Sequence, residues 1–375
     1  MSVESIQNLV NDARGGGAAL RIAGRSHWID AGRPVAATRI AALASHTGIV
    51  DYVPGDLTIT VRSGTTLREI ADVTGAEGQW FPLDPFGSTD GSIGATVATG
   101  SFGPLAHRFG SVRDLALGVE FVGGDGKIVR GGGRVVKNVA GFDLVRLITG
   151  SWGTLGVITE TTLRLYGAEV YPTTLVLTAP DGMARLAERI RDVLSAPATP
   201  YSVELVGAGV ARNIGLAART SLLVRIGGNA AAVASQKDAI ARLGGVEAVE
   251  PDLWERFRLI DGEETAVVRI SALPSRVTDV WGSAARALEP VDGALMHASA
   301  GLGIVRCIIP KSANHGVFAD IIAAFADCTV IFERLPRNAW AALSPSVVAD
   351  RLSQGVKKAF DPENILNPGI LGPLM

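Results

Sequence analysis

The first part of the chain, to about residue 166, alternates short β-branched runs with glycine-rich turns. Apolar and polar positions alternate in LTITV at 57–61 and in GVITETTLRLY at 156–166, and this period of two predicts β-strands. Residues 19–23 predict another strand, followed by a tight turn at 24–26. The turn signal GGDG at 123–126 predicts a hairpin between strands at 116–122 and 127–130.

One helix is predicted in this part, over residues 66–74. Thr65 or Thr66 can cap its first turn, and Glu69 stands near the capping-box position. Small and uncharged residues fill the run GSTDGSIGATVATGSFGP at 87–104, which contains no Lys, Arg or Glu. Such a run is either a flexible loop or a segment whose backbone lies flat against a large ligand.

The second part of the chain alternates strand and helix patterns. The predicted strands are residues 173–178, 202–206, 221–226, 265–271, 303–309 and 329–333. The predicted helices are 181–195, with Asp181 as N-cap, 232–243, 276–288 and 317–326. This order predicts two β-α-β-type units side by side, as in a ferredoxin-like layer. A last helix at 348–360 leads into the tail DPENILNPGILGPLM, so we expect domains at 1–167 and 168–347 and a C-terminal segment at 348–375.

Composition narrows the class of protein. A chain of 375 residues with 47% hydrophobic residues can bury two cores. A net charge of −2 gives no basic surface for nucleic acid, so no nucleic-acid partner is expected. No apolar run approaches the roughly 18 residues of a membrane span, and the N-terminus lacks a signal-peptide pattern. Cys307 and Cys328 are too few for a disulfide framework, a zinc site or an iron–sulfur cluster. A cytoplasmic location is therefore expected.

Three glycine-rich segments could hold an anion: 21–27 (RIAGRSH), 87–104 and 150–160 (GSWGTLGVITE). Glycines let backbone N–H groups converge on phosphate oxygens without interference from a Cβ. The dinucleotide fingerprint G-x-G-x-x-G is missing, because the fragment at Gly301 and Gly303 lacks its third glycine. The Walker A motif is missing too, because Gly126-Lys127 is followed by Ile128. A Rossmann NAD site and a P-loop ATPase are thus both disfavoured.

Taken in order, these segments and their neighbours resemble a known flavin-binding domain. The blocks are VPGDLTITVRSGTTLREIA at 53–71, SIGATVATGSFGP at 92–104, RFGSVRDLALGVEFVGGDGKIV at 108–129, KNVAGFDLVRLITGSWGTLGVITE at 137–160 and DPENILNPG at 361–369. They resemble the vanillyl-alcohol oxidase/p-cresol methylhydroxylase (PCMH) superfamily and, within it, the E subunits of glycolate oxidase. The resemblance implies an α+β fold: a PCMH-type FAD-binding domain of two α/β subdomains, followed by a ferredoxin-like α/β cap domain, with the tail returning to the flavin domain.

The resemblance implies a non-covalent FAD that lies extended between the two subdomains, with its pyrophosphate held by backbone N–H groups. The matching positions are Gly24, Arg25, Ser26, His27, Gly91, Ser92, Ile93, Gly94, Thr99, Gly100, Ser101, Arg108, Gly153, Gly156, Val157 and Ile158. Arg25 departs from the glycine-richer loop of relatives. His27 stands near the position through which some relatives attach flavin covalently. Arg108 could instead pair with Asp114. Asn138, Gly141 and Asp143 match positions beside the same pocket.

The same resemblance implies oxidation of a small 2-hydroxy acid, glycolate or D-lactate, in a complex with glycolate oxidase subunits D and F, the latter an iron–sulfur protein. The family's H-x-G-D-G-N metal motif is absent, so no metal site is expected. The segment at the corresponding place reads HASAGLGIVR, at 297–306. His297 is there a candidate base and Arg306 a candidate carboxylate clamp, or both are structural residues. Three alternatives stay open: an FAD-binding subunit of that complex, a self-sufficient 2-hydroxy-acid dehydrogenase, and a non-catalytic assembly subunit.

Overall fold

The computed structural model describes residues 1–133, 142–168, 172–249, 252–340, 348 and 350–372. It divides the chain into two compact units. The first comprises Met1–Phe102, Phe109–Ala168 and Pro345–Met375, and the second comprises Gly103–Arg108 and Glu169–Ser344. The C-terminal segment therefore belongs to the first unit, although the whole second unit precedes it in the sequence.

An antiparallel five-stranded sheet in the order β3-β4-β8-β6-β7 forms the centre of the first unit. Its strands are β3 (Ile49–Val53), β4 (Thr58–Arg62), β6 (Ala116–Val122), β7 (Ile128–Gly132) and β8 (Val157–Arg164). The helices of this part are α2 (Leu67–Gly75), α3 (Ile93–Thr99), α5 (Val112–Leu115) and α6 (Leu144–Ile148). Apolar side chains from all four helices pack with the sheet in one buried cluster, which fixes α3 against β8.

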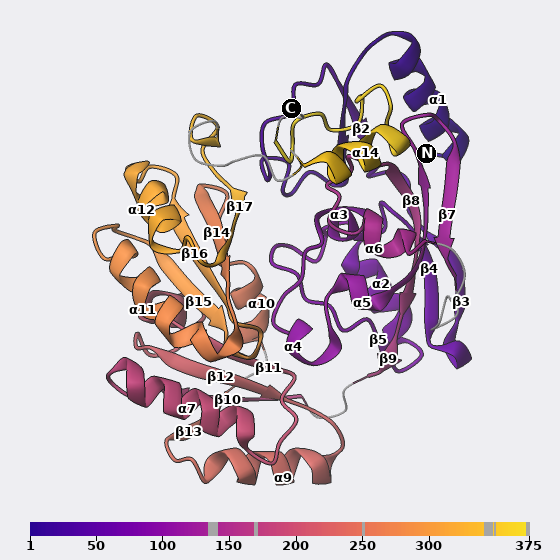
Figure 1. Cartoon of the computed structure of the whole chain (residues 1–375). Helices are drawn as coiled ribbons and strands as arrows, with labels where there is room; N and C mark the ends of the chain where they lie inside the picture. Colours follow the sequence, from indigo (N-terminus) through magenta and orange to yellow (C-terminus); the bar gives the residue numbers. More distant parts are fainter. Residues whose placement is uncertain (134–141, 169–171, 250–251, 341–347, 349, 373–375) are drawn as a thin grey trace. The chain divides into compact units, whose positions relative to one another are not determined.

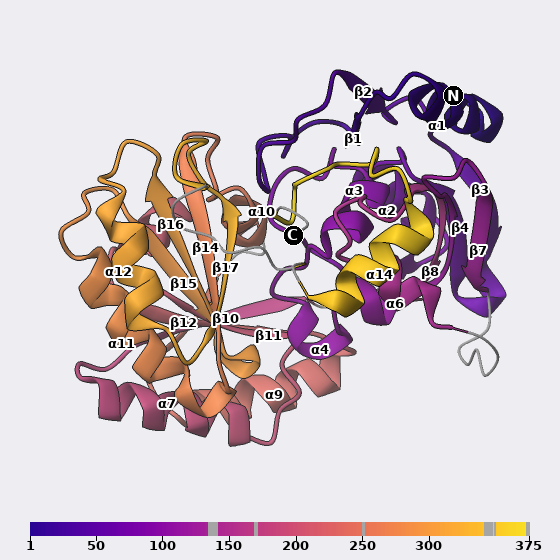
Figure 2. The same cartoon turned by 45° about the horizontal axis from the view of Figure 1, so that its top comes forward.

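A smaller layer joins both ends of the chain. The parallel pair β1 (Leu20–Ala23) and β2 (Arg39–Ala42) follows α1 (Val3–Gly15), and Leu20 also bridges Leu366 of the tail in parallel. Helix α14 (Arg351–Phe360) precedes that tail. Figures 1 and 2 show the yellow C-terminal segment beside the indigo N-terminal strands in both views. The first unit thus contains two α/β subdomains, with the C-terminal tail as part of the smaller one.

The second unit is an antiparallel eight-stranded sheet in the order β13-β10-β12-β11-β15-β16-β14-β17. Each half has the β-α-β-β-α-β arrangement of a ferredoxin-like fold, and β11 and β15 join the halves. The first half contains β10 (Thr173–Thr178), α7 (Met183–Ser195), β11 (Ser202–Val206), α8 (Ala208–Asn213), β12 (Ser221–Ile226), α9 (Ala230–Ala241) and β13 (Val246–Val249). The second contains α10 (Leu253–Arg258), β14 (Thr265–Ser271), α11 (Val277–Leu288), β15 (Leu295–Ser299), β16 (Ile304–Pro310), α12 (Gly316–Ala324) and β17 (Thr329–Arg334).

One face of this large sheet packs against α7, α9, α11 and α12 (Figure 1). Leu205, Ala298 and Cys307 belong to that buried cluster. Successive side chains of a strand point to opposite faces, so Glu204, His297 and Arg306 lie on the other face. These three polar residues therefore lie on the face opposite the helix-packed core.

The predicted α+β class, with a flavin-type domain and a ferredoxin-like domain, is confirmed. The capping box of α2 is present, with Thr66 as N-cap and Glu69 bonded back to it. Two predictions were wrong in detail. Helix α7 is capped at Gly182, whose positive φ ends the preceding turn, so Asp181 is not the cap. The sequence pattern also missed several elements, most of them too short or too rich in small residues to show a clear period: α1, β2, β3, α3, α5, α6, α8, α10, β13 and β15.

Candidate functional site

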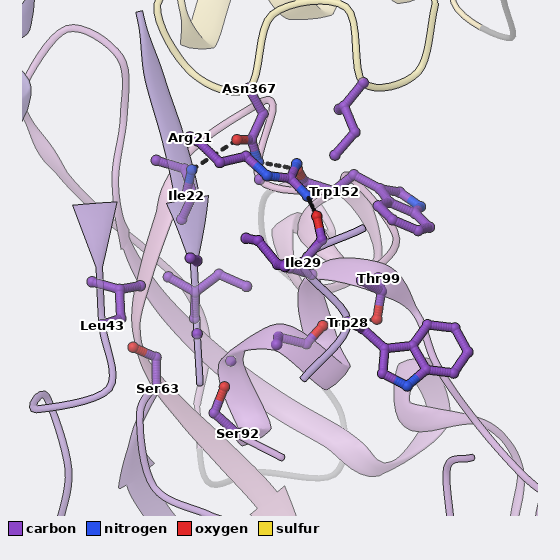
Figure 3. A pocket seen from close by; sticks show the side chains of 18 of the residues that line it. Arg21, Ile22, Trp28, Ile29, Leu43, Ser63, Ser92, Thr99, Trp152 and Asn367 are labelled. Carbon is purple, nitrogen blue, oxygen red and sulfur yellow. Dashed lines mark hydrogen bonds between the residues drawn. The ribbon is translucent and has the colours of Figure 1, made fainter. Parts of the chain in front are cut away.

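A groove in the first unit lies between the β1–β2 layer and the N-terminal end of α3. Its cavity volume is about 100 Å³, below the roughly 300–1,000 Å³ of most ligand pockets. Figure 3 shows Leu43 and Ser63 on one side and the indoles of Trp28 and Trp152 on the other. The lining residues are Arg21, Ile22, Ala23, Gly24, Trp28, Ile29, Leu43, Ser63, Ser92, Gly94, Ala95, Ala98, Thr99, Trp152, Gly153, Gly156, Ile158, Asn367 and Ile370. We call this the cofactor groove.

Glycines bring the walls of the groove together. A Cβ on Gly94 would lie 2.5 Å from Ser63 Cβ and 2.8 Å from the Ser63 carbonyl oxygen. A Cβ on Gly24 would overlap Ser92 Oγ. The strand end at Gly24 and the start of α3 can meet only because both positions lack a side chain. The small residues of 87–104 therefore allow close packing of the chain itself as well as access for a ligand.

The backbone donors at the start of α3 are largely used inside the protein. Ile93 N–H donates to Thr65 O at 2.9 Å, and Gly94 N–H donates to Ser63 O at 2.8 Å. Gly91 N–H donates to Ser88 O at 3.0 Å. The expectation that the run 87–104 lies flat is wrong, because residues 93–99 form a helix whose first turn bonds to the strand end at Ser63.

Two hydroxyl groups in the groove are buried without a hydrogen-bond partner among the described residues. Ser63 and Ser92 are each 1% exposed, and each Oγ atom is unpartnered. Both residues line the groove (Figure 3). A buried hydroxyl left unpaired costs about 1–3 kcal/mol, so a ligand oxygen at this place would relieve that cost. Ser92 is also the N-cap of α3, where the helix dipole favours an anion.

Arg21 supplies a positive charge to the same groove. Its Nη2 donates to the carbonyl oxygens of Ile29, at 2.9 Å, and Ala31, at 3.4 Å. Burial lowers the pKa of the Arg21 guanidinium from its ordinary value, but an arginine stays charged in proteins. Two serine hydroxyls, a helix start and one fixed cation form a site suited to the pyrophosphate of a dinucleotide.

The opposite end of the groove is closed by the tail. Asn367 Oδ1 accepts from Ile22 N–H at 2.8 Å, and its Nδ2 donates to Trp152 O at 2.7 Å. Trp152 and Asn367 both have positive φ, at 55° and 42°, which non-glycine residues adopt at a cost. At Gly153, also with positive φ, a Cβ would lie 2.9 Å from Asn367 Nδ2. Strained backbone of this kind concentrates at functional sites.

Comparison with known proteins agrees with this geometry. The family model described as "FAD binding domain" matches residues 1–132. Residues 1–132 therefore match an FAD-binding domain. The orphaned hydroxyls of Ser63 and Ser92 fit an FAD pyrophosphate, since both face the groove and lack a partner among the described residues. We therefore call the groove the FAD groove from here on.

Several curated proteins are similar to the chain over its first part. Glycolate oxidase subunit GlcE of Escherichia coli (strain K12) is 40% identical over 164 residues, 43% of this chain and 46% of that protein. Glycolate oxidase subunit GlcD of Bacillus subtilis (strain 168) is 32% identical over 158 residues, 42% of this chain and 33% of that protein. A probable mitochondrial D-lactate dehydrogenase of Danio rerio is 40% identical over 122 residues, 32% of this chain and 24% of that protein. The matched segment spans less than half of each relative.

A solved structure of alkyldihydroxyacetonephosphate synthase has the same fold. It aligns with 97% of this chain and 75% of its own, with a TM-score of 0.70 at 15% identity. At that identity the likeness shows the architecture alone.

The groove brings together only part of the residues matched by resemblance. Gly24, Ser92, Gly94, Thr99, Gly153, Gly156 and Ile158 line it. Arg25, Ser26, His27, Gly91, Ile93, Gly100, Ser101 and Val157 do not, and Arg108 groups with the second unit. The side chains of Ile93 and Val157 are buried in the core, so only their backbones can face a cofactor. Asn138 and Gly141 lie outside the described residues. The roles of all these residues toward FAD stay predictions.

Sequence reasoning missed Arg21, Trp28, Ser63, Trp152 and Asn367. Ser63 and Asn367 stand inside the RSGTT and LNPG blocks, so the resemblance could have pointed to them. The sequence left open whether Arg108 contacts the cofactor or forms an ion pair with Asp114. The carboxylate of Asp114 instead caps α5, accepting from Ser111 N–H at 2.8 Å and Ser111 Oγ at 2.9 Å.

The second unit brings His297 and Arg306 together, paired in register between β15 and β16. His297 Nδ1 lies 3.3 Å from Glu204 Oε2. Arg306 Nη2 lies 2.7 Å from Asp261 Oδ2 and 2.7 Å from Glu333 Oε2. Two carboxylates thus already balance the Arg306 charge, which favours a structural role over a substrate clamp.

Burial lowers the pKa of His297 well below its ordinary value, and the Arg306 charge lowers it further. His297 is therefore neutral at neutral pH. Among the residues that the structure describes, no group of three or more His, Cys, Asp or Glu side chains could hold a metal ion. In the same part of the chain, no helix has the length and apolar character to cross a bilayer.

Proposed function

We propose that this chain is the FAD-binding subunit of a complex that oxidises a 2-hydroxy acid, glycolate or D-lactate, to the 2-oxo acid. Its flavin would pass electrons to partner subunits, of which the D and F subunits of glycolate oxidase are the candidates. The observation that carries the proposal is the FAD groove with its buried, unpartnered Ser63 and Ser92 hydroxyls. The names of the relatives, glycolate oxidase subunits and a D-lactate dehydrogenase, supply the substrate class.

When bound, FAD supplies the two-electron acceptor that oxidation of an alcohol carbon requires. The residues of this chain hold it. The Ser63 and Ser92 hydroxyls would donate to pyrophosphate oxygens, and the Arg21 guanidinium would balance their charge. Trp28 and Trp152 offer aromatic surface for the rings. Asn367 holds the strand end at Ile22 and the turn at Trp152 in place.

The proposal assigns substrate chemistry to a partner more readily than to this chain. A base and a carboxylate clamp are needed to oxidise a 2-hydroxy acid. The candidates here are His297 and Arg306, and the contacts of Arg306 to Asp261 and Glu333 leave it electrostatically balanced. A clamp role would require a substrate carboxylate to compete with both. A self-sufficient dehydrogenase stays the second candidate, because the neutral His297 retains the protonation state of a base.

The test is the absorbance spectrum of the purified chain, recorded before and after glycolate or D-lactate is added without oxygen. Flavin bands that persist with the chain alone, but bleach when the D and F subunits are present, are the expected result. Bleaching in the chain alone would replace the proposal with the self-sufficient dehydrogenase. Bands that no substrate bleaches, even in the complete complex, would leave an assembly subunit. Absence of flavin after reconstitution with FAD would overturn the cofactor assignment.

A further inference from the structure

A second cavity in the first unit lies between α6 and α14. Its cavity volume is about 350 Å³, and its walls come from α5, α6, the turn at 149–155, α14 and the tail. It shares Asn367 with the FAD groove as a lining residue. At the same turn, Ser151 lines only this cavity and Trp152 lines only the FAD groove. We call it the α14 cavity.

Much of the wall is apolar. Leu147, Leu155, Val356 and Leu371 line it, and Leu352 stands at its edge with 77% of its surface exposed. Residues 352 and 356 are four positions apart, so they share one face of α14. A large leucine this exposed beside an apolar hollow is a feature of a binding surface.

The polar groups of the cavity are cationic or neutral. Arg113 and Arg146 line it, and none of its lining residues is an Asp or Glu. Arg146 Nε lies 3.2 Å from Asp143 Oδ2, so its charge is partly balanced. Arg113 is exposed, and no ion pair joins it to a residue that the structure describes. The cavity therefore carries a net positive charge at one side of an apolar wall.

A buried hydroxyl adds an independent sign of a ligand. Ser151 is 6% exposed and lines the cavity, and its Oγ has no hydrogen-bond partner among the described residues. The neighbouring hydroxyl groups differ. Thr149 Oγ1 donates to Val145 O at 2.7 Å, and Thr154 Oγ1 donates to Ser151 O at 2.6 Å. Ser151 Oγ is thus a hydroxyl that a ligand oxygen could pair with, since the described residues offer it no partner.

The wall is held in place before any ligand arrives. Lys357 Nζ donates to Thr154 O at 2.8 Å and to Leu366 O at 3.1 Å, and it pairs with Asp361. These bonds fix α14 to the turn and to the tail, and they use the Lys357 charge internally. A preformed site loses less conformational entropy on binding.

We propose that the α14 cavity binds an organic anion with an apolar chain. Its carboxylate would accept from Ser151 Oγ and from the Arg113 guanidinium, and its chain would cover Leu147 and Val356. The size and the lining, mostly apolar with a few fixed polar groups, match a small-molecule site. The cavity adjoins the FAD groove at Asn367, but the proposal does not rest on the proposed function.

Titration calorimetry on the FAD-loaded chain tests the class of ligand, with octanoate as the probe and octanol and inorganic phosphate as comparators. We expect saturable octanoate binding, one molecule per chain, about 10-fold tighter than either comparator, because charge-assisted bonds and apolar burial add. Octanol or phosphate binding as tightly as octanoate would overturn the amphipathic class. Octanoate binding only to the FAD-free chain would make the cavity part of the FAD site and overturn the proposal, as would no binding at all.

Variants locate the site. R113Q and S151A should each weaken octanoate binding about 5- to 10-fold, because each removes one hydrogen-bond donor to a charged group. R39Q changes an exposed arginine of β2, away from the cavity, and should bind like the parent chain. S151A removes a hydroxyl that has no partner among the described residues, so its thermal midpoint should not fall. Octanoate affinities unchanged in both R113Q and S151A would place binding elsewhere and overturn the assignment.

Discussion

Asn367 holds Trp152 through a single side-chain amide: Nδ2 donates to the Trp152 carbonyl at 2.7 Å, while Oδ1 accepts from Ile22 N–H at 2.8 Å. These three residues come from the tail, a turn and the first strand. The amide therefore joins three distant parts of the sequence at the end of the FAD groove. The C-terminal tail therefore forms part of the wall of the FAD groove.

Replacing Asn367 tests this connection. N367A removes two hydrogen bonds and places alanine at a φ of 42°, so we expect a loss of about 2–4 kcal/mol in the free energy of unfolding of the first unit. N367G loses the same bonds but tolerates the positive φ, so it should lose about 1 kcal/mol less. Urea unfolding followed by tryptophan fluorescence measures both. An N367A variant as stable as the parent would show that the amide does not support the groove.

Removing the groove hydroxyls should weaken FAD binding without lowering the stability of the chain. S63A and S92A each delete a buried hydroxyl without a partner among the described residues, so the apo chain should be as stable as the parent or more stable. Each should weaken FAD binding about 10-fold, because a donor to a charged phosphate is lost. Flavin fluorescence titration gives the dissociation constants.

The matched control for that pair is S202A in the second unit. Ser202 Oγ is also buried without a partner among the described residues, but it lies far from the groove in the sequence and in another unit. S202A should therefore leave FAD affinity unchanged. Equal FAD affinities for all three variants would remove Ser63 and Ser92 from the site.

Gly94 should tolerate no side chain. The Cβ of G94A would lie 2.5 Å from Ser63 Cβ, so α3 would have to move away from the strand end. We expect a loss of about 1–3 kcal/mol, seen as a lower thermal midpoint, together with weaker FAD binding. G55A is the control, because nothing lies within 4 Å of a Cβ there. A G94A midpoint equal to that of G55A would contradict the close packing.

His297 should make the stability of the second unit depend on pH. Its folded pKa lies well below the ordinary 6.5, so in mildly acidic solution the unfolded chain binds a proton that the folded chain does not. Stability should therefore be full above about pH 6.5 and fall as the pH decreases below it, by up to about 1.4 kcal/mol per pH unit. Urea midpoints measured from pH 7.5 to 5 should show a shallower decline in H297Q than in the parent or in H315Q.

Arg306 should be needed for folding rather than for turnover alone. R306Q leaves Asp261 and Glu333 as neighbouring buried carboxylates without their shared cation. Breaking such a buried group by removing one partner costs about 3–5 kcal/mol. We expect low soluble yield and early urea unfolding of the second unit. A stable R306Q variant that has lost only substrate turnover would instead support the carboxylate-clamp role.

The periodic parts of the sequence predicted the fold well. The strands predicted at 202–206 and 221–226 are β11 and β12 with the same bounds, and Thr66 with Glu69 predicted the start of α2. The misses have physical causes. Helix α3 is built from small residues whose amphipathic period is weak, and β15 is recognisable only once β11 and β16 lie on either side of it.

The sequence predicted which segments contribute to the site, but it did not predict which hydrogen-bond donors are available there. The glycine-rich blocks predicted a groove for a dinucleotide; Gly24, Ser92 and Gly94 line a groove, and its ligand stays a prediction. The backbone N–H groups expected to hold the phosphates are partly occupied, since Ile93 and Gly94 donate to the chain's own carbonyls. Which donors remain for a ligand depends on neighbours that no local pattern contains.

By itself the sequence determined the two domain types, the FAD class of cofactor and the absence of a family metal motif. The domain types follow from residue type and spacing, which are local properties, whereas the cofactor class and the metal motif follow from the resemblance of the glycine-rich blocks to a known family. Only the tertiary structure decided that Ser63 and Ser92 find no hydrogen-bond partner among the described residues, that Asn367 closes the groove, and that Arg306 is balanced by Asp261 and Glu333. Each of those facts depends on contacts between residues far apart in the chain, and the free energy of such contacts is set by burial and by the partners that packing provides.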